Sequence, residues 1–213
     1  MYSIYIFDLD GTLLDTLGDL AASTNYALRT HGMPEHSIDD VRRFVGNGVR
    51  KLMERAIPDG VDNPQFEATF ATFREHYMHH SLDTTRPYDG IPEMLTALKA
   101  KGCRLAVVSN KMMAATQELC RFFFPDTIEV AIGENEAEGI KKKPAPDTVF
   151  AALKALNGSP ENAVYVGDSD VDIETARNAG LPCISVLWGF RDREFLLQHG
   201  ASIFITAPDA LLK

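Results

Sequence analysis

The chain has few cysteines, few basic residues and no long apolar run, and each shortage excludes a class of protein. Its three cysteines, Cys103, Cys120 and Cys183, are odd in number and widely spaced, which fits neither a disulfide framework nor a zinc site. No window approaches the roughly 18 apolar residues that a membrane helix needs. Lys and Arg number 21 against 30 Asp and Glu, and the resulting net charge of −9 argues against nucleic-acid and anionic-membrane partners.

What remains is the composition of an ordinary globular protein. Hydrophobic residues make up 45% of the 213 residues, enough for a sizeable core in one or two domains. The first apolar run begins almost at Met1, so we expect no signal peptide. Buried free thiols in a reducing compartment fit the cysteines best. These features together predict a cytoplasmic protein; they leave its oligomeric state open.

The most informative segment is the apolar run at residues 2–7 and the polar residues that follow it, Asp8-Leu9-Asp10-Gly11-Thr12. A short apolar run bounded by glycine is typical of a buried strand. Side chains two residues apart on a strand point the same way, so Asp8 and Asp10 reach its carboxyl end together, where open α/β sheets bind ligands. An acidic turn would explain one Asp and the glycine, but not two acids and Thr12.

Three more polar groups follow strand-like apolar runs further along the chain. Residues 105–108 lead into Ser109-Asn110-Lys111, and residues 128–132 lead through a charged loop into Lys143-Pro144. Residues 163–166 lead into Gly167-Asp168-Ser169-Asp170-Val171-Asp172. Polar chemistry therefore recurs at the ends of four predicted strands.

The spacing of apolar residues changes along the chain and predicts its organisation. Helical spacing appears over residues 17–28, 49–56 and 66–77, with no convincing strand between residues 13 and 82. From Gly90 onward predicted helices alternate with strands, which favours a mostly parallel α/β sheet covered on both faces. We therefore expect an α/β core from residues 1–14 and 82–213, with an inserted all-helical domain at 15–81.

The four motifs, in this order, resemble those of the haloacid dehalogenase-like superfamily of hydrolases, and the resemblance spans nearly the whole chain. It implies a Rossmann-like core with a small helical cap, phosphatase activity and a Mg²⁺ cofactor. Two further segments resemble bacterial phosphoglycolate phosphatases: Phe44-Val45-Gly46-Asn47-Gly48-Val49-Arg50 and Trp188-Gly189-Phe190.

The first motif supplies the predicted reacting groups. Asp8 is the candidate nucleophile by its place at the strand end, and the resemblance supports this; attack on phosphorus would form an aspartyl-phosphate. Asp10 is the candidate general acid for the leaving oxygen and then the base for water. The resemblance also implies that the Asp10 backbone carbonyl binds the metal. Thr12 either contacts the phosphoryl group or is an ordinary turn hydroxyl.

The acids of the first and fourth motifs predict a metal site. Asp8, Asp10 and Asp168 would give Mg²⁺ the hard oxygen ligands that it prefers. Two carboxylates about 4 Å apart repel by roughly 4 kcal/mol at an effective dielectric near 20, so such a cluster with a phosphate needs a countercharge. We expect Asp170 to cap the following helix. The resemblance implies that Asp172 orients the metal site or the motif lysine.

The second and third motifs predict phosphate contacts. The Ser109 hydroxyl and nearby backbone N–H groups can grip phosphoryl oxygens, with Asn110 in support, although a plain Ser-Asn turn fits the local sequence equally well. Lys143 is the candidate group that neutralises the transferring phosphoryl group, because Pro144 restricts it to an extended conformation.

Lys141 and Lys142 are alternatives to Lys143, although solvent exposure suits both better. Lys111 is either a surface residue or a third phosphate contact.

Substrate selection is assigned to the helical insertion. Gly46, Asn47 and Gly48 precede a helix with Arg50 and Lys51 in its first turn, where an anion would offset the basic charges. An ordinary Asn-capped helix with solvated basic residues is the alternative.

The sequence as a whole predicts a Mg²⁺-dependent phosphatase of a small phosphorylated metabolite, with 2-phosphoglycolate as the best candidate. A phosphomutase or pyrophosphatase of the same superfamily is one alternative, and a dehalogenase is a weaker one because Asp10 is present. A non-catalytic sensor of phosphorylated metabolites is a further alternative, which the intact Asp8, Asp10, Lys143 and Asp168 argue against.

Overall fold

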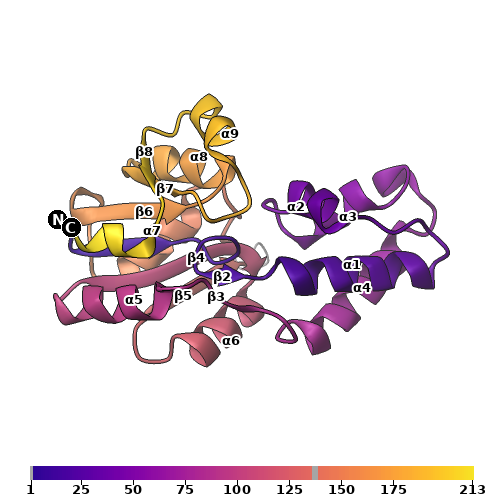
Figure 1. Ribbon diagram of the computed structural model, residues 1–213, viewed down its shortest axis with the longest axis horizontal. Coiled ribbons are helices and arrows are strands. Elements are labelled where there is room, and N and C mark those ends of the chain that lie inside the picture. Colours follow the sequence, from indigo (N-terminus) through magenta and orange to yellow (C-terminus); the bar gives the residue numbers. More distant parts are fainter. Residues whose placement is uncertain (1, 136–138) are drawn as a thin grey trace. The chain divides into compact units, whose positions relative to one another are not determined.

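The computed structural model describes residues 2–135 and 139–213, and the chain forms two compact units (Figure 1). One unit contains Met1–Leu14 and Pro87–Lys213, and the other contains Asp15–Arg86. The first is an α/β sheet structure and the second is almost entirely helical. Each unit is described separately below.

A six-stranded parallel sheet is the centre of the first unit, in the order β5-β4-β1-β6-β7-β8. Its strands are β1 (Ile4–Phe7), β4 (Arg104–Met112), β5 (Val130–Glu134), β6 (Ala163–Gly167), β7 (Cys183–Val186) and β8 (Ile203–Ile205). The central strand β1 pairs with β4 on one side and with β6 on the other. The chain reverses its direction of winding beside β1, and such a switch point is where doubly wound sheets bind ligands.

Alternating side chains of β1 supply a separate apolar core on each face of this sheet. Tyr5 and Phe7 pack with α5 (Ile91–Ala100) and α6 (Met113–Phe123) on one face. Ile4 and Ile6 pack with α7 (Asp147–Ala155) and α8 (Asp170–Ala179) on the other. The helix α9 (Arg193–Gln198) and the short 3₁₀ helices η3 (Pro160–Asn162) and η4 (Pro208–Leu212) also belong to this unit. The predicted α/β class is correct, with β1 buried on both faces.

The second unit consists of α1 (Leu17–Thr30), α2 (Ile38–Phe44), α3 (Val49–Ala56) and α4 (Phe66–His80), with a 3₁₀ turn η1 (Gly60–Asp62). The sequence analysis did not predict α2, which is short and buries only Val41 of its seven residues, although Ile38, Val41 and Phe44 recur every three positions. A local signal was present nonetheless: Ser37 and Asp40 form a capping box at its start.

Short strands lie where the chain passes between the units. β2 (Leu14–Asp15) pairs with β3 (Arg86–Pro87). The expectation of no strand between residues 13 and 82 was therefore wrong for the two residues of β2. The helical unit also extends five residues beyond its predicted end at residue 81. The reason is Asp19, whose buried carboxylate accepts hydrogen bonds from the backbone N–H and hydroxyl groups of Thr84 and Thr85.

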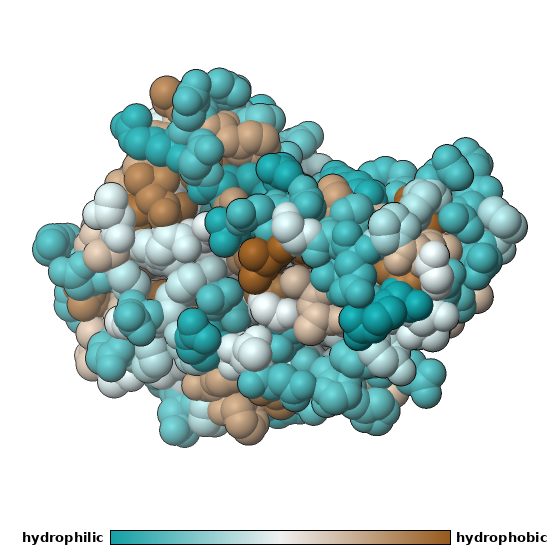
Figure 2. Space-filling model, turned by 45° about the vertical axis from the view of Figure 1, so that its right-hand side comes forward, coloured by the Kyte–Doolittle hydropathy of each residue, from teal (hydrophilic) through white to brown (hydrophobic). Residues whose placement is uncertain are grey.

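The visible surface in Figure 2 is mostly hydrophilic, with apolar residues in small separate patches. Within the described residues, no helix is long and apolar enough to cross a membrane.

Candidate active site

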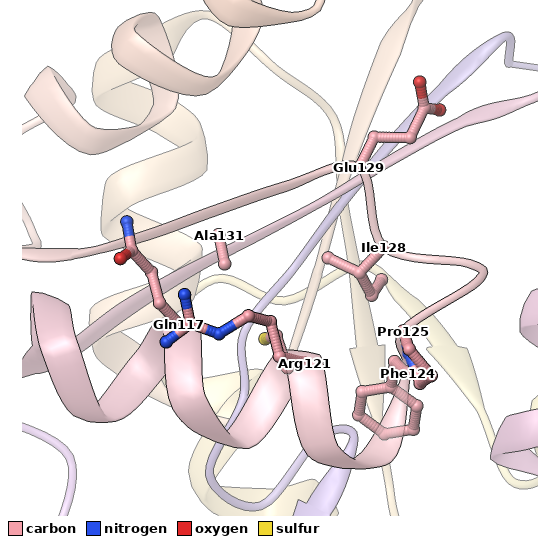
Figure 3. Close-up of a pocket in the computed structure, with 8 residues that line it drawn as sticks. Gln117, Arg121, Phe124, Pro125, Ile128, Glu129 and Ala131 are labelled. Carbon is pink, nitrogen blue, oxygen red and sulfur yellow. The ribbon is translucent and has the colours of Figure 1, made fainter.

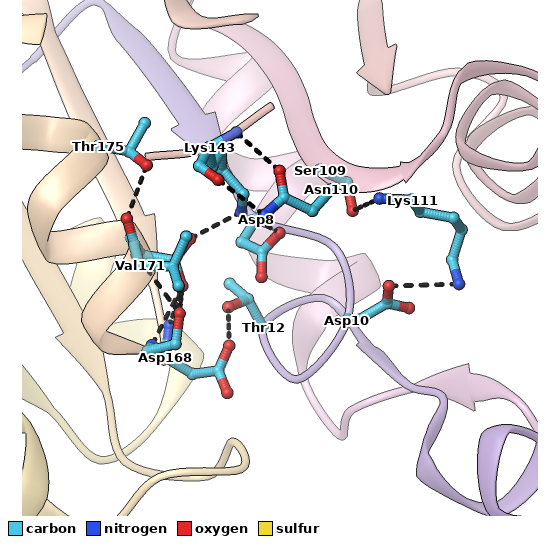
Figure 4. A network of polar contacts seen from close by, with 12 residues as sticks. Asp8, Asp10, Thr12, Ser109, Asn110, Lys111, Lys143, Asp168, Val171 and Thr175 are labelled. Atoms are coloured by element: carbon cyan, nitrogen blue, oxygen red, sulfur yellow. Dashed lines mark hydrogen bonds and ion pairs between the residues drawn. The ribbon is translucent and has the colours of Figure 1, made fainter. Parts of the chain in front are cut away.

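Asp8 lies at the carboxyl end of β1, where it meets a buried lysine from a distant loop (Figure 4). The Lys143 ammonium donates to Asp8 Oδ1 at 2.7 Å, to Asp172 Oδ1 at 2.8 Å and to the Tyr165 hydroxyl at 3.2 Å. All three of its N–H donors are thus used. Lys143 is 3% exposed, whereas Lys141 and Lys142 are exposed to solvent, so the structure places only Lys143 of this run in the site.

Three carboxylates gather around this lysine. Oxygen atoms of Asp8, Asp168 and Asp172 lie within 4.8 Å of one another, and all three residues are buried. Three ionised carboxylates and one ammonium give the cluster a formal charge of −2. A buried excess of this size is unfavourable unless protons or a cation offset it, and one divalent cation would match it.

The close approach of like charges shifts the pKa values of the residues in this cluster. Burial, then the neighbouring Asp172, raises the pKa of Asp168 to about 7. Burial and Asp172 also raise the pKa of Asp8 well above its usual value, although Lys143 acts in the opposite direction. Burial alone would lower the pKa of Lys143, but the attraction of Asp172 and Asp8 outweighs it and raises that pKa. Lys143 therefore stays positively charged, whereas repulsion between the neighbouring carboxylates makes Asp8 and Asp168 weaker acids.

Asp172 connects the third and fourth motifs. Its Oδ1 accepts from Lys143 and Tyr165, and its Oδ2 accepts from the backbone N–H groups of Asp168 and Ser169. The Ser169 hydroxyl in turn accepts from the Asp172 backbone, so these two residues form a capping box at the start of α8. The prediction that Asp170 caps this helix was wrong, because Ser169 is the N-cap residue.

Both oxygens of Asp172 accept at least two hydrogen bonds each, whereas Asp8 Oδ1 accepts one from Lys143. The oxygens of Asp168 accept from the neutral Thr12 hydroxyl and Phe190 N–H, so a metal ion would compete with fewer bonds at Asp8 and Asp168 than at Asp172. The hard, anionic oxygens of these residues fit Mg²⁺.

A loop after β7 fixes Asp168 in a way that the sequence did not predict. The backbone N–H of Phe190 donates to Asp168 Oδ2 at 2.8 Å, and the Thr12 hydroxyl donates to Oδ1 at 3.0 Å. The Trp188 indole donates to the Thr12 carbonyl at 3.0 Å, which closes the ring of contacts. A Cβ atom on Gly189 would lie 2.3 Å from Asp168, so only glycine fits there. Thr12 is thus placed against Asp168.

The second motif lies within β4, which continues four residues beyond its predicted end at residue 108. Asn110 binds the backbone of Lys143 twice: its Nδ2 donates to the Lys143 carbonyl at 3.1 Å, and its Oδ1 accepts from the Lys143 N–H at 2.7 Å. The buried Ser109 hydroxyl accepts from the Lys111 N–H at 3.2 Å. Asn110 therefore anchors the lysine that neutralises the cluster.

Asp10 differs from the other acids of the motifs. Its carboxylate is absent from the three-carboxylate cluster and lies 3.2 Å from the ammonium of Lys111 (Figure 4). Lys111 is only 4% exposed, so it is not a surface residue. Sequence reasoning left both its burial and its partner open, because neither follows from local spacing.

The four predicted cap residues, Gly46, Asn47, Gly48 and Arg50, lie at the start of α3 in the helical unit. Gly48, with φ 86°, is the N-cap residue, and it offers no side-chain cap, so the alternative of an Asn-capped helix is wrong. Asn47 instead accepts a hydrogen bond from Arg55 at 2.8 Å. Arg50 forms a bidentate pair with Glu67 on the surface of this unit.

A pocket elsewhere in the sheet unit contains none of the predicted site residues. It lies between α6 and β5, has a volume of about 220 Å³ and is lined mainly by Gln117, Cys120, Arg121, Phe124, Ile128 and Glu129 (Figure 3). Burial raises the pKa of the Cys120 thiol to about 12, so this cysteine is not a reactive nucleophile.

Residues 5–186 match the model of the haloacid dehalogenase-like hydrolase family, which covers the helical insertion and all four motifs. The chain belongs to this family. It is therefore an enzyme of the hydrolase class, with the Rossmann-like α/β fold of that family.

Curated and structural relatives agree with this assignment. The chain is 37% identical to a phosphoglycolate phosphatase of Aquifex aeolicus, over 88% of this chain and 85% of the relative. It is 32% identical to an N-acetylmuramic acid 6-phosphate phosphatase of Pseudomonas aeruginosa, over 97% and 92%. A crystal structure described as a candidate phosphoglycolate phosphatase from Lactobacillus delbrueckii subsp. bulgaricus superposes with a TM-score of 0.94 and 36% identity, over 99% and 96%.

Proposed function

We propose that the chain is a Mg²⁺-dependent phosphatase that hydrolyses a small phosphomonoester, with 2-phosphoglycolate as its substrate. The observation that carries this proposal is the buried cluster of Asp8, Asp168 and Asp172 around Lys143, with an excess charge of −2. A stable interior would not need three converging acids, but a site for a divalent cation and a phosphate does.

Asp8 is proposed as the nucleophile. Its carboxylate would attack phosphorus and form an aspartyl-phosphate, while the alcohol leaves. Mg²⁺, held by Asp8, Asp168 and the Asp10 carbonyl, would supply positive charge that offsets the acids and the phosphate dianion. Lys143 adds a fixed cation, which Asp172 and Asn110 hold in place.

Asp10 is proposed as the general acid that protonates the leaving oxygen, and then as the base that deprotonates the water attacking the aspartyl-phosphate. This second step releases inorganic phosphate and restores Asp8. Ser109 and Asn110 are proposed to bind phosphoryl oxygens. Thr12 is proposed to act through Asp168, whose carboxylate it already contacts.

The choice of substrate rests on the relatives and on the helical unit. Phosphoglycolate carries a carboxylate, and Arg50 with the loop Gly46-Asn47-Gly48 is proposed to recognise it. In the structure the Arg50 guanidinium already binds Glu67, so a carboxylate would take the place of that side chain. N-acetylmuramic acid 6-phosphate is a second candidate, because the relative named for it matches 97% of this chain.

A substrate panel tests the proposal. Purified protein is assayed for phosphate release from 2-phosphoglycolate, N-acetylmuramic acid 6-phosphate, a hexose phosphate, pyrophosphate and p-nitrophenyl phosphate, with Mg²⁺ or with EDTA. We expect the highest kcat/KM for 2-phosphoglycolate and no turnover in EDTA. An isomerised sugar phosphate would indicate a mutase instead, and no turnover of any ester with Mg²⁺ would reject catalysis in favour of a sensor.

A further inference from the structure

We propose that Lys111 is a positioning residue for the reaction: its buried ammonium holds the Asp10 carboxylate in the orientation from which Asp10 protonates the leaving group. The inference rests on the proposed acid–base role of Asp10, and it assigns a function to the one lysine of the four motifs that this role left unexplained.

The contact between the two side chains is direct and one-sided. Lys111 Nζ lies 3.2 Å from Asp10 Oδ2, and the Lys111 side chain is 3% exposed. The other carboxylate oxygen, Oδ1, is buried and has no hydrogen-bond partner among the residues that the structure describes. One oxygen is thus fixed and the other has no hydrogen bond that a proton transfer would have to break. A general acid needs this arrangement, because the free oxygen must exchange a proton with the substrate.

The backbone of Lys111 is fixed on several sides. Its N–H donates to Ser109 Oγ at 3.2 Å, and its carbonyl accepts from the Thr116 hydroxyl at 3.3 Å. A Cβ atom on Gly133 of β5 would lie 2.6 Å from the same carbonyl, so β5 packs closely against it. A side chain that starts from a rigid backbone and is buried loses little further entropy when its ammonium binds a carboxylate.

The two buried lysines of the motifs have separate partners. Lys143 binds Asp8 and Asp172, whereas Lys111 binds Asp10, and in Figure 4 the Asp10 carboxylate points toward Lys111 and away from Asp168. This division prevents Asp10 from joining the crowded acids or from pairing with Lys143. Without Lys111, the Asp10 side chain would lose the contact that selects its rotamer. Its second carboxylate oxygen would then be oriented toward the leaving group in a smaller fraction of the bound complexes.

The dependence on the leaving group tests the proposal. An alkoxide such as that of 2-phosphoglycolate needs a proton to leave, whereas p-nitrophenolate leaves without one. We expect Lys111→Met to lower kcat/KM for 2-phosphoglycolate by about 10- to 100-fold, less than the roughly 100- to 10,000-fold of full general acid catalysis because Asp10 itself is still present, and for p-nitrophenyl phosphate by less than about threefold. Lys111→Arg should restore most of the loss, and Lys142→Met, an exposed neighbour of the site, should change neither value.

The ratio of the two kcat/KM values is the decisive quantity, because a partly unfolded fraction lowers both values equally and cancels. Equal losses for both esters in Lys111→Met, or no loss for either, would overturn the proposal.

A double variant separates action through Asp10 from any other role. In the Asp10→Asn background, Lys111→Met should cause no further loss with 2-phosphoglycolate, because the group that it positions is already absent. Full additivity of the two losses would overturn the proposal while leaving the acid–base role of Asp10 intact. If Asp10→Asn alone lowers kcat/KM equally for both esters, the proposed role of Asp10 fails and the inference fails with it.

Discussion

In the helical unit, the pairs Arg29–Glu35 and Arg50–Glu67 lie at the surface, whereas in the sheet unit Lys143 meets Asp8 and Asp172 in the interior. Exposed pairs contribute little to stability because water screens them. A buried pair costs desolvation energy, and the third acid at this site adds repulsion. Stability therefore explains neither set, and for the buried set the explanation that remains is chemistry.

A buried acid in the helical unit sharpens the contrast. Asp19 is 2% exposed, yet its neighbours are the neutral donors of Thr84 and Thr85, which satisfy its carboxylate without a cation. Asp168 is equally buried but lies beside two other acids. Burial alone therefore does not identify a functional acid in this chain; the crowding of like charges does.

The largest expected effect is the loss of turnover in Asp8→Asn. The amide is a poor nucleophile, so kcat should fall by at least about 10³-fold while the circular dichroism spectrum stays unchanged. Asp170→Asn is the matched control: this acid lies in the first turn of α8, outside the cluster, and its removal should leave kcat near that of the native protein. A native rate in Asp8→Asn would show that Asp8 is not the nucleophile, and the buried cluster would then not differ in function from the surface ion pairs of the helical unit.

The next effect concerns stability in the absence of metal. The folded-state pKa of Asp168, about 7, lies above the 3.8 that is usual for an aspartate, so between these two pH values the folded state binds more protons than the unfolded state. The free energy of unfolding should therefore decrease as pH rises through this range, by up to about 4 kcal/mol from this residue. Asp168→Asn removes the contribution of this residue, so its free energy of unfolding should decrease less with pH and should exceed that of the native protein at pH 8.

Urea unfolding at pH 5 and pH 8 in EDTA measures both proteins. The same decrease in the native protein and in Asp168→Asn would contradict the assignment of this pH dependence to the cluster.

In the helical unit, replacing the buried acid should lower the stability of the protein rather than raise it. Asp19→Ala leaves buried donors of Thr84 and Thr85 unpaired, and it should destabilise the protein by about 2–3 kcal/mol. Thermal unfolding measures the loss, and kcat/KM below the unfolding range should stay near the native value. If Asp19→Ala were more stable than the native protein, Asp19 would destabilise the fold as Asp168 does, and the contrast between the two buried acids would be contradicted.

The smallest expected effect is at the surface pair. Arg50→Ala should raise KM for 2-phosphoglycolate more than for p-nitrophenyl phosphate, and Glu67→Gln should lower KM for 2-phosphoglycolate because it frees the guanidinium. Steady-state kinetics with both esters measures the difference. Equal changes in KM for the two esters would show that Arg50 does not recognise the carboxylate.

The sequence was sufficient where periodicity and order along the chain decide the structure. Residues 2–7 gave the buried central strand, and the four motifs placed Asp8, Lys143 and Asp168 at one edge of the sheet. Local reasoning failed at α2, which has a single buried residue, and at Asp170, where the neighbouring Ser169 is the cap. The capping box of each helix could have corrected both.

Other features depend on contacts between residues distant in the chain and have no local signal. Trp188 donates to Thr12 across 176 positions, and Lys143 meets the hydroxyl of Tyr165, a residue that looks like any other apolar strand residue. The partner of Lys111 is likewise fixed by the pairing of β1 with β4. These contacts follow from the register of the sheet, which the sequence pattern does not specify.

The central claim is that the buried acids of the sheet unit form a site for one divalent cation. Calorimetric titration of the metal-free protein with Mg²⁺ tests it most directly, with Asp168→Asn and Asp170→Asn measured alongside. We expect one ion per chain for the native protein and for Asp170→Asn, and no measurable binding for Asp168→Asn. Unchanged Mg²⁺ binding in Asp168→Asn would contradict the claim.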